Sequence, residues 1–313
     1  MRYLLSIIVP IYNVVGFLER CLDSIPLFSG RIELILVDDG SDDGSGSLAD
    51  LFAKGKENVH VYHKPNGGLS SARNYGLKYS SGKYVFFVDS DDYLNGHELN
   101  SLLDALENIN DDVVAFNTCR IWDSFANKYS FFGFEGTISG LDFLKEQLIH
   151  QSFKVAVWNY IFSKRFLDRV SVPFKEGIVQ EDTLWTPLVL SSAKTVLFKD
   201  VVVYNYCIRS NSISTRKDLS KNMVDLISTI NILLDHFKDS DALFYRLLKD
   251  YLVNNYLSVF AQDRFYKKGK EFTLKYSFLR KDVYFQKTKA KLFLYGLNKR
   301  FYYLLSNAAK KGQ

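Results

Sequence analysis

Short apolar runs alternate with helix-length polar segments over the first 120 residues. Five such runs recur about every 25 residues, at positions 6–11, 32–38, 59–62, 84–89 and 113–117. This alternation predicts an α/β fold with a mostly parallel sheet and helices on both faces. Ligands of such sheets bind at the carboxyl ends of the strands. We therefore expect the functional residues to follow the first, second and fourth runs.

The alternation stops after residue 117. Residues 118–140 are aromatic, contain Gly133 and Gly136, and have no clear period, which predicts irregular structure or a hairpin. Helical spacing of apolar residues resumes beyond residue 216. We expect a catalytic domain over residues 1–215 and a helical region over 216–313, which associates with a membrane or with a second copy.

Composition limits the class of protein. With 313 residues, 47% of them apolar, the chain can form one large core with an appendage or two smaller ones. Its three cysteines are far apart and include no C-x-x-C pair, so neither a disulfide framework nor a structural zinc site is expected. No apolar stretch reaches the roughly 18 residues of a membrane span. We expect a cytoplasmic protein, soluble or peripheral at the inner face of the cell membrane.

Charge is distributed unevenly along the chain. Residues 264–313 contain fourteen Lys and Arg against Glu271 and Asp282, which gives +12, whereas the whole chain carries +5 and residues 1–263 therefore −7. Apolar residues recur at helical spacing within this tail, with basic residues mostly outside the stripe. The stripe comprises Ala290, Phe293, Leu294, Leu297, Phe301, Leu304 and Leu305. The pattern favours an anionic membrane surface as partner, and leaves open packing on the catalytic domain, a homo-oligomer or a solvated face.

A run of acidic residues follows the fourth apolar run. Asp89-Ser90-Asp91-Asp92 comes directly after residues 84–88. Residues two apart in a strand share a face, so Asp89 and Asp91 would point the same way if the strand continued into the turn. Carboxylate oxygens suit Mg²⁺ or Mn²⁺, which would neutralise a departing diphosphate. By itself a D-x-D pattern is weak evidence, because acidic turns are common.

Two further motifs follow the second and third runs. In the segment V-D-D-G-S-D-D-G-S, residues 37–45, four acids would repel one another unless some accept hydrogen bonds from the backbone or from a ligand such as a base or ribose. Asp42, Asp43 or Ser45 could instead cap the next helix. In N-G-G-L-S-S-A-R-N-Y-G, residues 66–76, glycines and a helix start lie close to Arg73, an arrangement that suits an anion. An ordinary capped helix is the alternative.

Together these motifs resemble those of the family 2 glycosyltransferases, which have the GT-A fold. The match covers residues 5 to 95 and includes I-I-V-P-I-Y-N and F-V-D-S-D-D-Y-L. The resemblance implies that Pro10 and Tyr12 flank the base and ribose, that Asp38 and Asp39 contact them, and that Arg73 lines the nucleotide pocket. It also implies that Asp89, Ser90 and Asp91 form the metal and sugar-nucleotide motif, with Asp89 and Asp91 as metal ligands.

Two more segments resemble family elements. Glu181-Asp182-Thr183-Leu184-Trp185 is similar to E-D-x-x-W, in which the Asp is the catalytic base, and an acceptor hydroxyl needs such a carboxylate to take its proton. A simple helix start is the alternative for Asp182. Arg209, in a segment similar to R-x-x-S-I, would stabilise the leaving diphosphate.

The chain departs from the family at residues 158–160. Trp158-Asn159-Tyr160 stands where relatives often read W-N-K, which puts in doubt a cation in the acceptor pocket at that position. The five histidines form no convincing ligand cluster.

The resemblance implies an inverting, metal-dependent glycosyltransferase. Its expected donor is a nucleotide sugar, specifically a UDP-sugar, and its expected acceptor is a glycan on a lipid carrier, as in capsule polysaccharide synthesis. A non-catalytic sugar-nucleotide-binding or scaffold protein is the alternative. Nucleic acid is not an expected partner, because the basic residues of the tail are interleaved with apolar ones.

Overall fold

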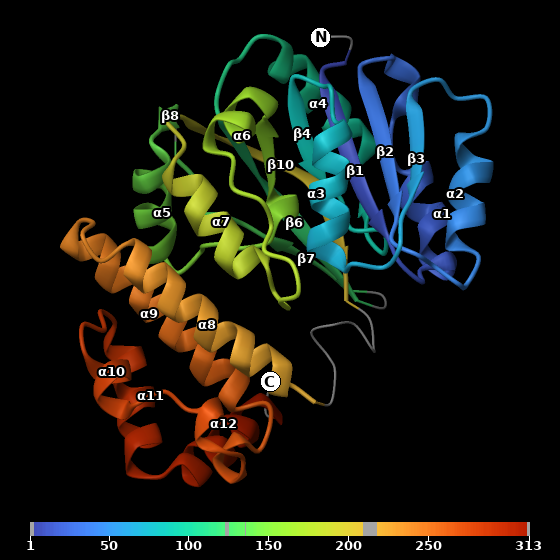
Figure 1. Cartoon of the computed structure of the whole chain (residues 1–313). Coiled ribbons are helices and arrows are strands. Elements are labelled where there is room, and N and C mark those ends of the chain that lie inside the picture. Colours follow the sequence, from blue (N-terminus) through green and yellow to red (C-terminus); the bar gives the residue numbers. More distant parts are fainter. Residues whose placement is uncertain (1–2, 123–124, 135, 209–217, 312–313) are drawn as a thin grey trace. The chain divides into compact units, whose positions relative to one another are not determined.

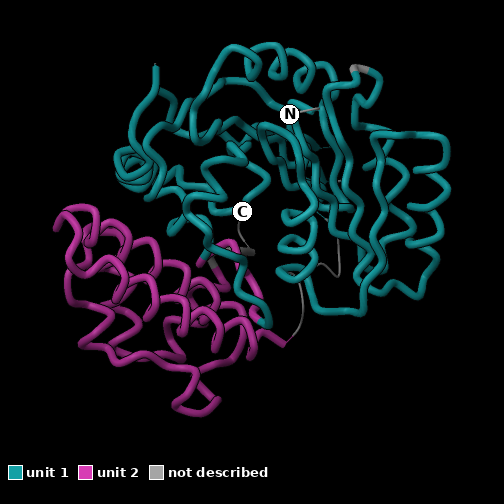
Figure 2. Tube along the Cα trace, turned by 45° about the horizontal axis from the view of Figure 1, so that its top comes forward, with its two compact units in different colours: residues 1–177, 185–209 teal, residues 178–184, 210–313 magenta. Residues whose placement is uncertain are grey.

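The chain forms two compact units. The computed structural model describes residues 3–122, 125–134, 136–208 and 218–311. The first unit comprises residues 1–177 and 185–209, and the second comprises residues 178–184 and 210–313 (Figure 2). The predicted domain boundary at residue 215 falls within 209–217, outside the described residues.

Four parallel strands form one half of the sheet of the first unit, in the order β3-β2-β1-β4 (Figure 1). They are β1 (Leu5–Ile11), β2 (Ile32–Asp38), β3 (Val59–His63) and β4 (Tyr84–Phe87). The helices that connect them, or follow the last of them, are α1 (Val15–Asp23), α2 (Ser45–Ala53), α3 (Leu69–Tyr79) and α4 (Gly96–Glu107). The predicted α/β alternation is therefore confirmed.

Beyond β4 the sheet is mixed. The order continues β9-β6-β10-β5, with β7 and β8 paired at its side, and β9 runs antiparallel to both neighbours. These strands are β5 (Tyr93–Leu94), β6 (Val113–Trp122), β7 (Phe125–Tyr129), β8 (Thr137–Ile138), β9 (Tyr160–Ser163) and β10 (Val196–Cys207). The helices of this half are α5 (Gly140–Ile149), α6 (Lys164–Val170) and α7 (Asp182–Ser191), with short 3₁₀ turns η1 (Leu27–Ser29) and η2 (Val157–Asn159). The antiparallel pairing of β6 and β7 is the hairpin that residues 118–140 suggested.

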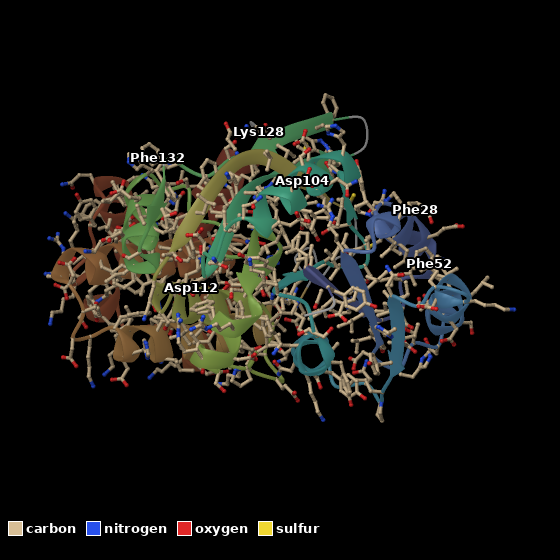
Figure 3. The ribbon with its side chains drawn as sticks, turned by 90° about the horizontal axis from the view of Figure 1, so that it is seen from above. Phe28, Phe52, Asp104, Asp112, Lys128 and Phe132 are labelled. Carbon is tan, nitrogen blue, oxygen red and sulfur yellow. The ribbon has the colours of Figure 1, made fainter. Side chains whose placement is uncertain are left out.

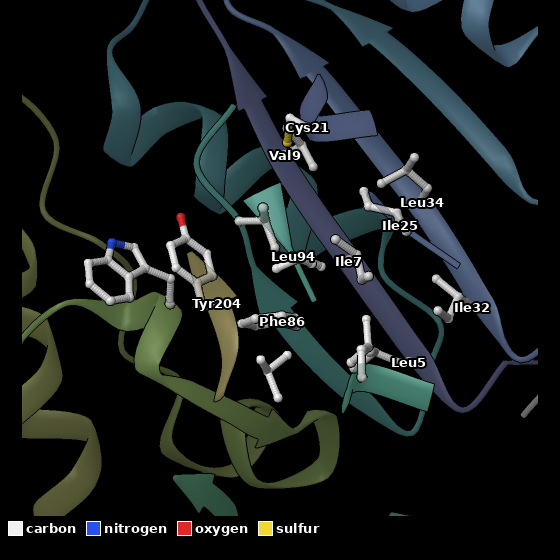
Figure 4. Packing of buried hydrophobic residues seen from close by; sticks show 14 of the residues in the cluster. Leu5, Ile7, Val9, Cys21, Ile25, Ile32, Leu34, Phe86, Leu94 and Tyr204 are labelled. Atoms are coloured by element: carbon white, nitrogen blue, oxygen red, sulfur yellow. The ribbon is translucent and has the colours of Figure 1, made fainter. Parts of the chain in front are cut away.

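The core of the first unit lies around β1 and β2. Every residue of both strands is buried, including Ser6 and Glu33, which explains why the strands are mainly apolar on both faces rather than alternating. Side chains from β1 and β2 pack there with Phe86 of β4 and Tyr204 of β10 (Figure 4). β1 and β2 end opposite each other, at Ile11 and Asp38, where the polar loops begin.

The second unit is helical, as predicted. Beyond residue 217 the described elements are α8 (Ser220–His236), α9 (Ala242–Phe260), η4 (Phe265–Lys267), η5 (Lys270–Phe272), α10 (Tyr276–Arg280), α11 (Gln286–Leu297) and α12 (Lys299–Lys311). The buried carboxylate of Asp250 accepts the backbone N–H groups of Tyr284 and Phe285 at 3.1 and 2.9 Å, just before α11 begins. None of the described helices is both long and apolar enough to cross a bilayer.

Candidate active site

Three loops with predicted functional residues leave neighbouring strands. Because β2, β1 and β4 are adjacent and parallel, the segments that follow them emerge side by side at one edge of the sheet. Tyr12 follows β1, Asp39 follows β2 and Asp89 follows β4. The structure thus brings residues from three distant motifs to one edge, where ligands of α/β sheets bind.

The loop after β2 also holds the start of the first helix. Asp43 accepts the N–H of Val15 at 2.9 Å, and the Ser45 hydroxyl accepts that of Val14 at 2.9 Å, so both satisfy donors at the start of α1. Asp43 also accepts the N–H of Ser45, the first residue of α2, at 2.9 Å. The N-cap position of α2 is Gly44, which has no side-chain cap, so the predicted N-cap by an acidic or Ser side chain is wrong and Asp43 satisfies only the first N–H of the helix. Asp43 and Ser45 also fasten the loops after β1 and β2 to each other.

Asp38 ends β2 and is paired with a histidine that the sequence did not single out. Its carboxylate accepts the N–H of Ser41 at 3.0 Å and lies 2.8 Å from Nδ1 of His63. Burial opposes ionisation, but these hydrogen bonds outweigh it and lower the pKa of Asp38. Hydrogen bonds to Asp38 and to Asp50 in turn raise the pKa of His63. Asp38 and His63 are the last residues of the adjacent strands β2 and β3, and they lie opposite each other. The sequence alone does not show this pairing.

Asp39 organises the glycine loop that precedes α3. Only 2% of the residue is exposed, and its carboxylate accepts the N–H of Gly67 at 3.0 Å and of Gly68 at 2.7 Å. Lys64 forms an ion pair with the same carboxylate. Gly68 has a φ of 86°, which a side chain rarely adopts. Asp39 therefore fixes the backbone of this loop, and its predicted contact with a base or ribose stays a prediction.

Arg73 and Asp89 form an ion pair at the acidic turn. The Arg73 guanidinium, which is 1% exposed, donates to Oδ1 of Asp89 at 2.8 Å. It also lies 5.4 Å from the ring centroid of Phe174. An Arg in a fixed position orients the carboxylate that accepts from it. Arg73 thus acts on the acidic motif itself, in addition to any role in lining the nucleotide pocket.

The acidic motif lies in a turn rather than in a strand. β4 ends at Phe87, and the N–H of Asp92 donates to the carbonyl of Asp89 at 3.1 Å. The strand was expected to extend to Asp89, so the strand geometry does not explain how Asp89 and Asp91 would converge. The side chain of Asp89 is 27% exposed and Asp91 is partly exposed. Their pairing as metal ligands stays a prediction.

Asp92 connects this turn to the end of β10. The residue is 1% exposed, and its carboxylate accepts from the Tyr204 hydroxyl at 2.5 Å and from the Cys207 N–H at 2.7 Å. The Tyr204 hydroxyl also accepts the N–H of Asp89 at 3.2 Å. Arg20 donates to the carbonyl of Asp91 at 2.8 Å. Burial, together with the charges of Asp91 and Asp89, raises the pKa of Asp92.

The residues at the end of β1 and just beyond it differ in exposure. Pro10 is buried within β1, whereas Tyr12 is 52% exposed and can present its ring to a ligand. Asn13 has a φ of 51°, and its side chain accepts the N–H of Asp42 at 3.0 Å, which fixes the bend after Tyr12.

Ser90, the remaining predicted residue of the acidic turn, is 6% exposed.

The E-D-x-x-W element forms the start of α7. Asp182 is the first residue of the helix and is partly exposed, and residues 178–184 belong to the second unit. Trp185 belongs to the first unit, where it is 1% exposed and stacks on Phe174 with centroids 4.3 Å apart. Its indole N–H donates to the carbonyl of Val172 at 2.8 Å. The helix start is thus observed, and the role of Asp182 as a base stays a prediction.

Two further predicted features have different outcomes. Arg209 and the segment similar to R-x-x-S-I lie outside the described residues. At the departure from W-N-K, Trp158 stacks on Tyr204 with centroids 4.6 Å apart. The Tyr160 hydroxyl donates to the carbonyl of Lys154 at 2.5 Å. The aromatic residue at the third position is therefore part of the buried packing.

Lys154 is a buried cation in this region. Only 2% of the residue is exposed, and its Nζ lies 3.1 Å from the ring centroid of Tyr129, which also lies 3.7 Å from the guanidinium of Arg120. Burial, and then the like charge of Arg120, lowers the pKa of Lys154 to about 7. The sequence around residue 154 does not indicate that this lysine is buried or that its pKa is lowered.

Comparison with known proteins identifies the family. The model of the family described as glycosyl transferase family 2 matches residues 6–156, which contain all three strand-end loops. Glycosyltransferase GlyG of Streptococcus pneumoniae serotype 4 is 31% identical over 272 residues, which are 80% of this chain and 88% of GlyG. The chain belongs to glycosyl transferase family 2.

Other relatives and structures of this family 2 member are more distant or longer. Uncharacterized glycosyltransferase EpsJ of Bacillus subtilis is 34% identical over 219 residues, and the match covers 67% of this chain but 63% of EpsJ. The chain thus spans just under two thirds of that relative. The structure of S. aureus TarS 1–349 in complex with UDP-GlcNAc has a TM-score of 0.72 at 21% identity and covers 99% of this chain and 92% of that one. The GT-A fold is thereby confirmed.

Proposed function

We propose that this protein transfers a sugar from a nucleoside-diphosphate sugar to a glycan acceptor, with inversion at the anomeric carbon. The observation that carries the proposal is the group of loops after β1, β2 and β4, which present Tyr12, Asp39 and Asp89 at one edge of the sheet. A UDP-sugar is the proposed donor, and the fold shared with TarS, whose structure contains UDP-GlcNAc, supports this choice.

On the donor side, fixed loops would form the nucleotide pocket. The exposed ring of Tyr12 would stack on the base, and Pro10 would shape the strand end beneath it. Asp38 and Asp39 are held by His63 and by the glycine loop, so the backbone around them would meet the base and ribose without rearranging. Arg73 would keep the Asp89 carboxylate oriented towards the diphosphate.

A divalent cation, Mg²⁺ or Mn²⁺, fits the acidic turn. Asp89 and Asp91 offer hard oxygen donors, and both residues are partly exposed. No group of three or more His, Cys, Asp or Glu among the described residues could complete a closed metal site. Two carboxylates suit an open site in which donor phosphates supply further ligands. When bound, the cation would neutralise negative charge that develops on the leaving diphosphate.

On the acceptor side, Asp182 is the proposed base. Its carboxylate would take the proton of the acceptor hydroxyl as that oxygen attacks the anomeric carbon, and the bond to the diphosphate would break in the same step. Arg209 is proposed to stabilise the negative charge of the leaving group. A single displacement inverts the anomeric centre, so an α-linked donor would give a β-linked product.

The proposed acceptor is a polysaccharide repeat unit on a lipid carrier, and the proposed location is the inner face of the cell membrane. The support for both is the basic, amphipathic C-terminal part of the chain. An acceptor on a lipid would be reached most readily by an enzyme that stays at the membrane surface.

A screen of nucleotide sugars tests the proposed activity. The protein is incubated with each sugar nucleotide, with Mg²⁺, with Mn²⁺ and with a chelator, and the release of nucleoside diphosphate is measured. We expect turnover of one donor that depends on the divalent ion. Tight donor binding without turnover in any mixture, including those with extracted lipid-linked glycans, would favour a non-catalytic binding or scaffold protein instead.

A further inference from the structure

Helices α11 and α12 each bury one face against the rest of the second unit. Leu292 and Tyr295 of α11 and Tyr302 of α12 are buried. The hydroxyl of Tyr302 donates to the carbonyl of Leu257 in α9 at 3.3 Å, and Tyr295 lies 3.0 Å from the Tyr256 hydroxyl. These contacts fix which way both helices face within the unit.

The apolar stripe expected from the sequence lies largely on the opposite side. Phe293 and Leu297 of α11 are 60% and 64% exposed, and the exposed apolar residues of α12 are Phe301, Leu304 and Leu305, at 49%, 51% and 41%. In the first unit, by contrast, the exposed residues Phe28 and Phe132 lie far from each other (Figure 3), and the exposed Trp122 and Phe125 form only a stacked pair. Scattered exposed apolar residues are ordinary, whereas a contiguous group marks an interaction surface.

The same two helices also carry a high positive charge. Residues 286–311 contain seven Lys and Arg and no Asp or Glu. Among the basic residues, Lys287, Lys289 and Arg300 are exposed. Lys291 instead turns inward and donates to the side chain of Asn254 at 2.8 Å. A surface that combines exposed Phe and Leu with uncompensated cations matches the boundary between acyl chains and anionic headgroups.

We infer that the exposed face of α11 and α12 binds an anionic lipid bilayer. Phe293, Leu297, Phe301, Leu304 and Leu305 enter the headgroup boundary, and the exposed basic residues contact lipid phosphates. The inference deepens the proposed membrane location, on which it rests, and is independent of the identity of the donor and acceptor.

A second copy of the chain fits this face less well. In a two-fold dimer the same patch meets itself, so the cations of one copy would approach those of the other. The absence of any acidic residue in 286–311 means that neither helix offers a carboxylate to pair with them. An anionic bilayer supplies both the apolar interior and the opposite charge.

Vesicle co-sedimentation of the full-length protein tests the inference. The vesicles contain phosphatidylglycerol or only phosphatidylcholine, at low and at high salt. We expect binding to the anionic vesicles that salt weakens. The double variant Leu297→Ser with Phe301→Ser should bind about tenfold or more weakly, because two large apolar side chains no longer leave water. The pair Lys287→Glu with Lys289→Glu should remove the preference for anionic lipid.

Matched variants in the first unit control for general effects. Leu51→Ser alters a leucine that is 67% exposed on α2, and Lys54→Glu with Lys56→Glu repeats the charge change near the end of that helix. Both should bind vesicles like the wild type. Sedimentation velocity of each protein without lipid measures self-association.

Three results would overturn the inference. They are no binding of the wild type to anionic vesicles at low salt, an equal loss in the controls on α2, and a wild-type dimer that Leu297→Ser with Phe301→Ser converts to monomer. If the protein binds vesicles but turns over no sugar nucleotide, the inferred lipid-binding face still holds and only the proposed activity is contradicted.

Discussion

The carboxylates at the edge of the first unit differ from Asp182 in what surrounds them. Asp39 and Asp89 are each bonded to a basic side chain, and Asp39 also accepts two backbone N–H groups. Asp182, at the start of α7, is partly exposed, where the positive end of the helix favours a negative charge. Carboxylates bound in this way keep the loops of this edge in place, whereas a carboxylate at a helix start lies where the helix favours its charged form. The comparison predicts a positioning role for Asp39, while proton transfer stays the proposed role of Asp182.

The largest effect is expected from Asp182→Asn. This change removes the proposed proton acceptor and should lower turnover by about 10²–10⁴-fold. Donor affinity should stay close to normal, since the loops after β1, β2 and β4 are unchanged. Steady-state kinetics and titration calorimetry with the donor measure the two quantities separately. Near-normal turnover would mean that Asp182 only begins α7.

A smaller effect, on binding, is expected from Asp91→Ala. Losing one of two proposed carboxylate ligands should weaken metal-dependent donor binding by about 100-fold, because the cation loses both coordination and opposite charge. Calorimetry with and without Mn²⁺ measures this, with Asp42→Ala as a control, since Asp42 is an exposed acid in a neighbouring loop. Equally tight donor binding by the wild type without a divalent ion would contradict the metal assignment.

Asp39→Ala tests the positioning role directly. It leaves the Gly67 and Gly68 N–H groups and the ammonium of Lys64 without the carboxylate that now satisfies them. We expect the free energy of unfolding to fall by about 3 kcal/mol, as for other buried ion pairs that lose one partner. Urea denaturation measures the change, and Asp42→Ala should alter stability by less than about 0.5 kcal/mol. If both variants were equally stable, Asp39 would not hold the glycine loop.

The sequence predicted where the motifs lie in the fold better than it predicted which side chains their residues contact. The first two strands were predicted to within one residue, because buried parallel strands read as mainly apolar runs, here interrupted by Ser6 and Glu33. The fourth was predicted to extend to Asp89 but ends at Phe87, where the turn that carries the acids begins. β10 was not predicted, and its register shifts between Lys199 and Tyr204 interrupt any strand pattern.

The partners of the site residues were missed for a different reason. Tyr204 reaches Asp92 across 112 residues of sequence, and Arg20 reaches Cys207 across 187. Such contacts depend on strand order, and the mixed half of the sheet was not predictable from apolar spacing. His63 was likewise dismissed, although its register opposite Asp38 gives it a partner.

Lys154→Met should have the opposite effect to Asp39→Ala. Asp39 is buried beside the oppositely charged Lys64, whereas the charged neighbour of the buried Lys154 is the like-charged Arg120. Methionine has a similar length and packs well on aromatic rings. We expect the free energy of unfolding at pH 6 to rise by about 1–2 kcal/mol, since the desolvation cost of the ammonium exceeds the cation–π gain with Tyr129.

The pH dependence of this stabilisation distinguishes the effect of the Lys154 charge from the effect of side-chain packing at residue 154. The pKa of Lys154 falls from its ordinary 10.5 to about 7 on folding. Between these values the unfolded chain binds a proton that the folded chain lacks, so this group makes the wild type more stable as pH rises from about 7 towards 10.5. The advantage of Lys154→Met should therefore be largest below pH 7 and shrink towards pH 10, as measured by urea denaturation at pH 6, 8 and 9.5. Lys175→Met, at an exposed lysine, is the matched control for the Lys-to-Met change. A Lys154→Met protein that is less stable at pH 6, with the same pH dependence as the wild type, would mean that the ammonium stabilises the fold through Tyr129.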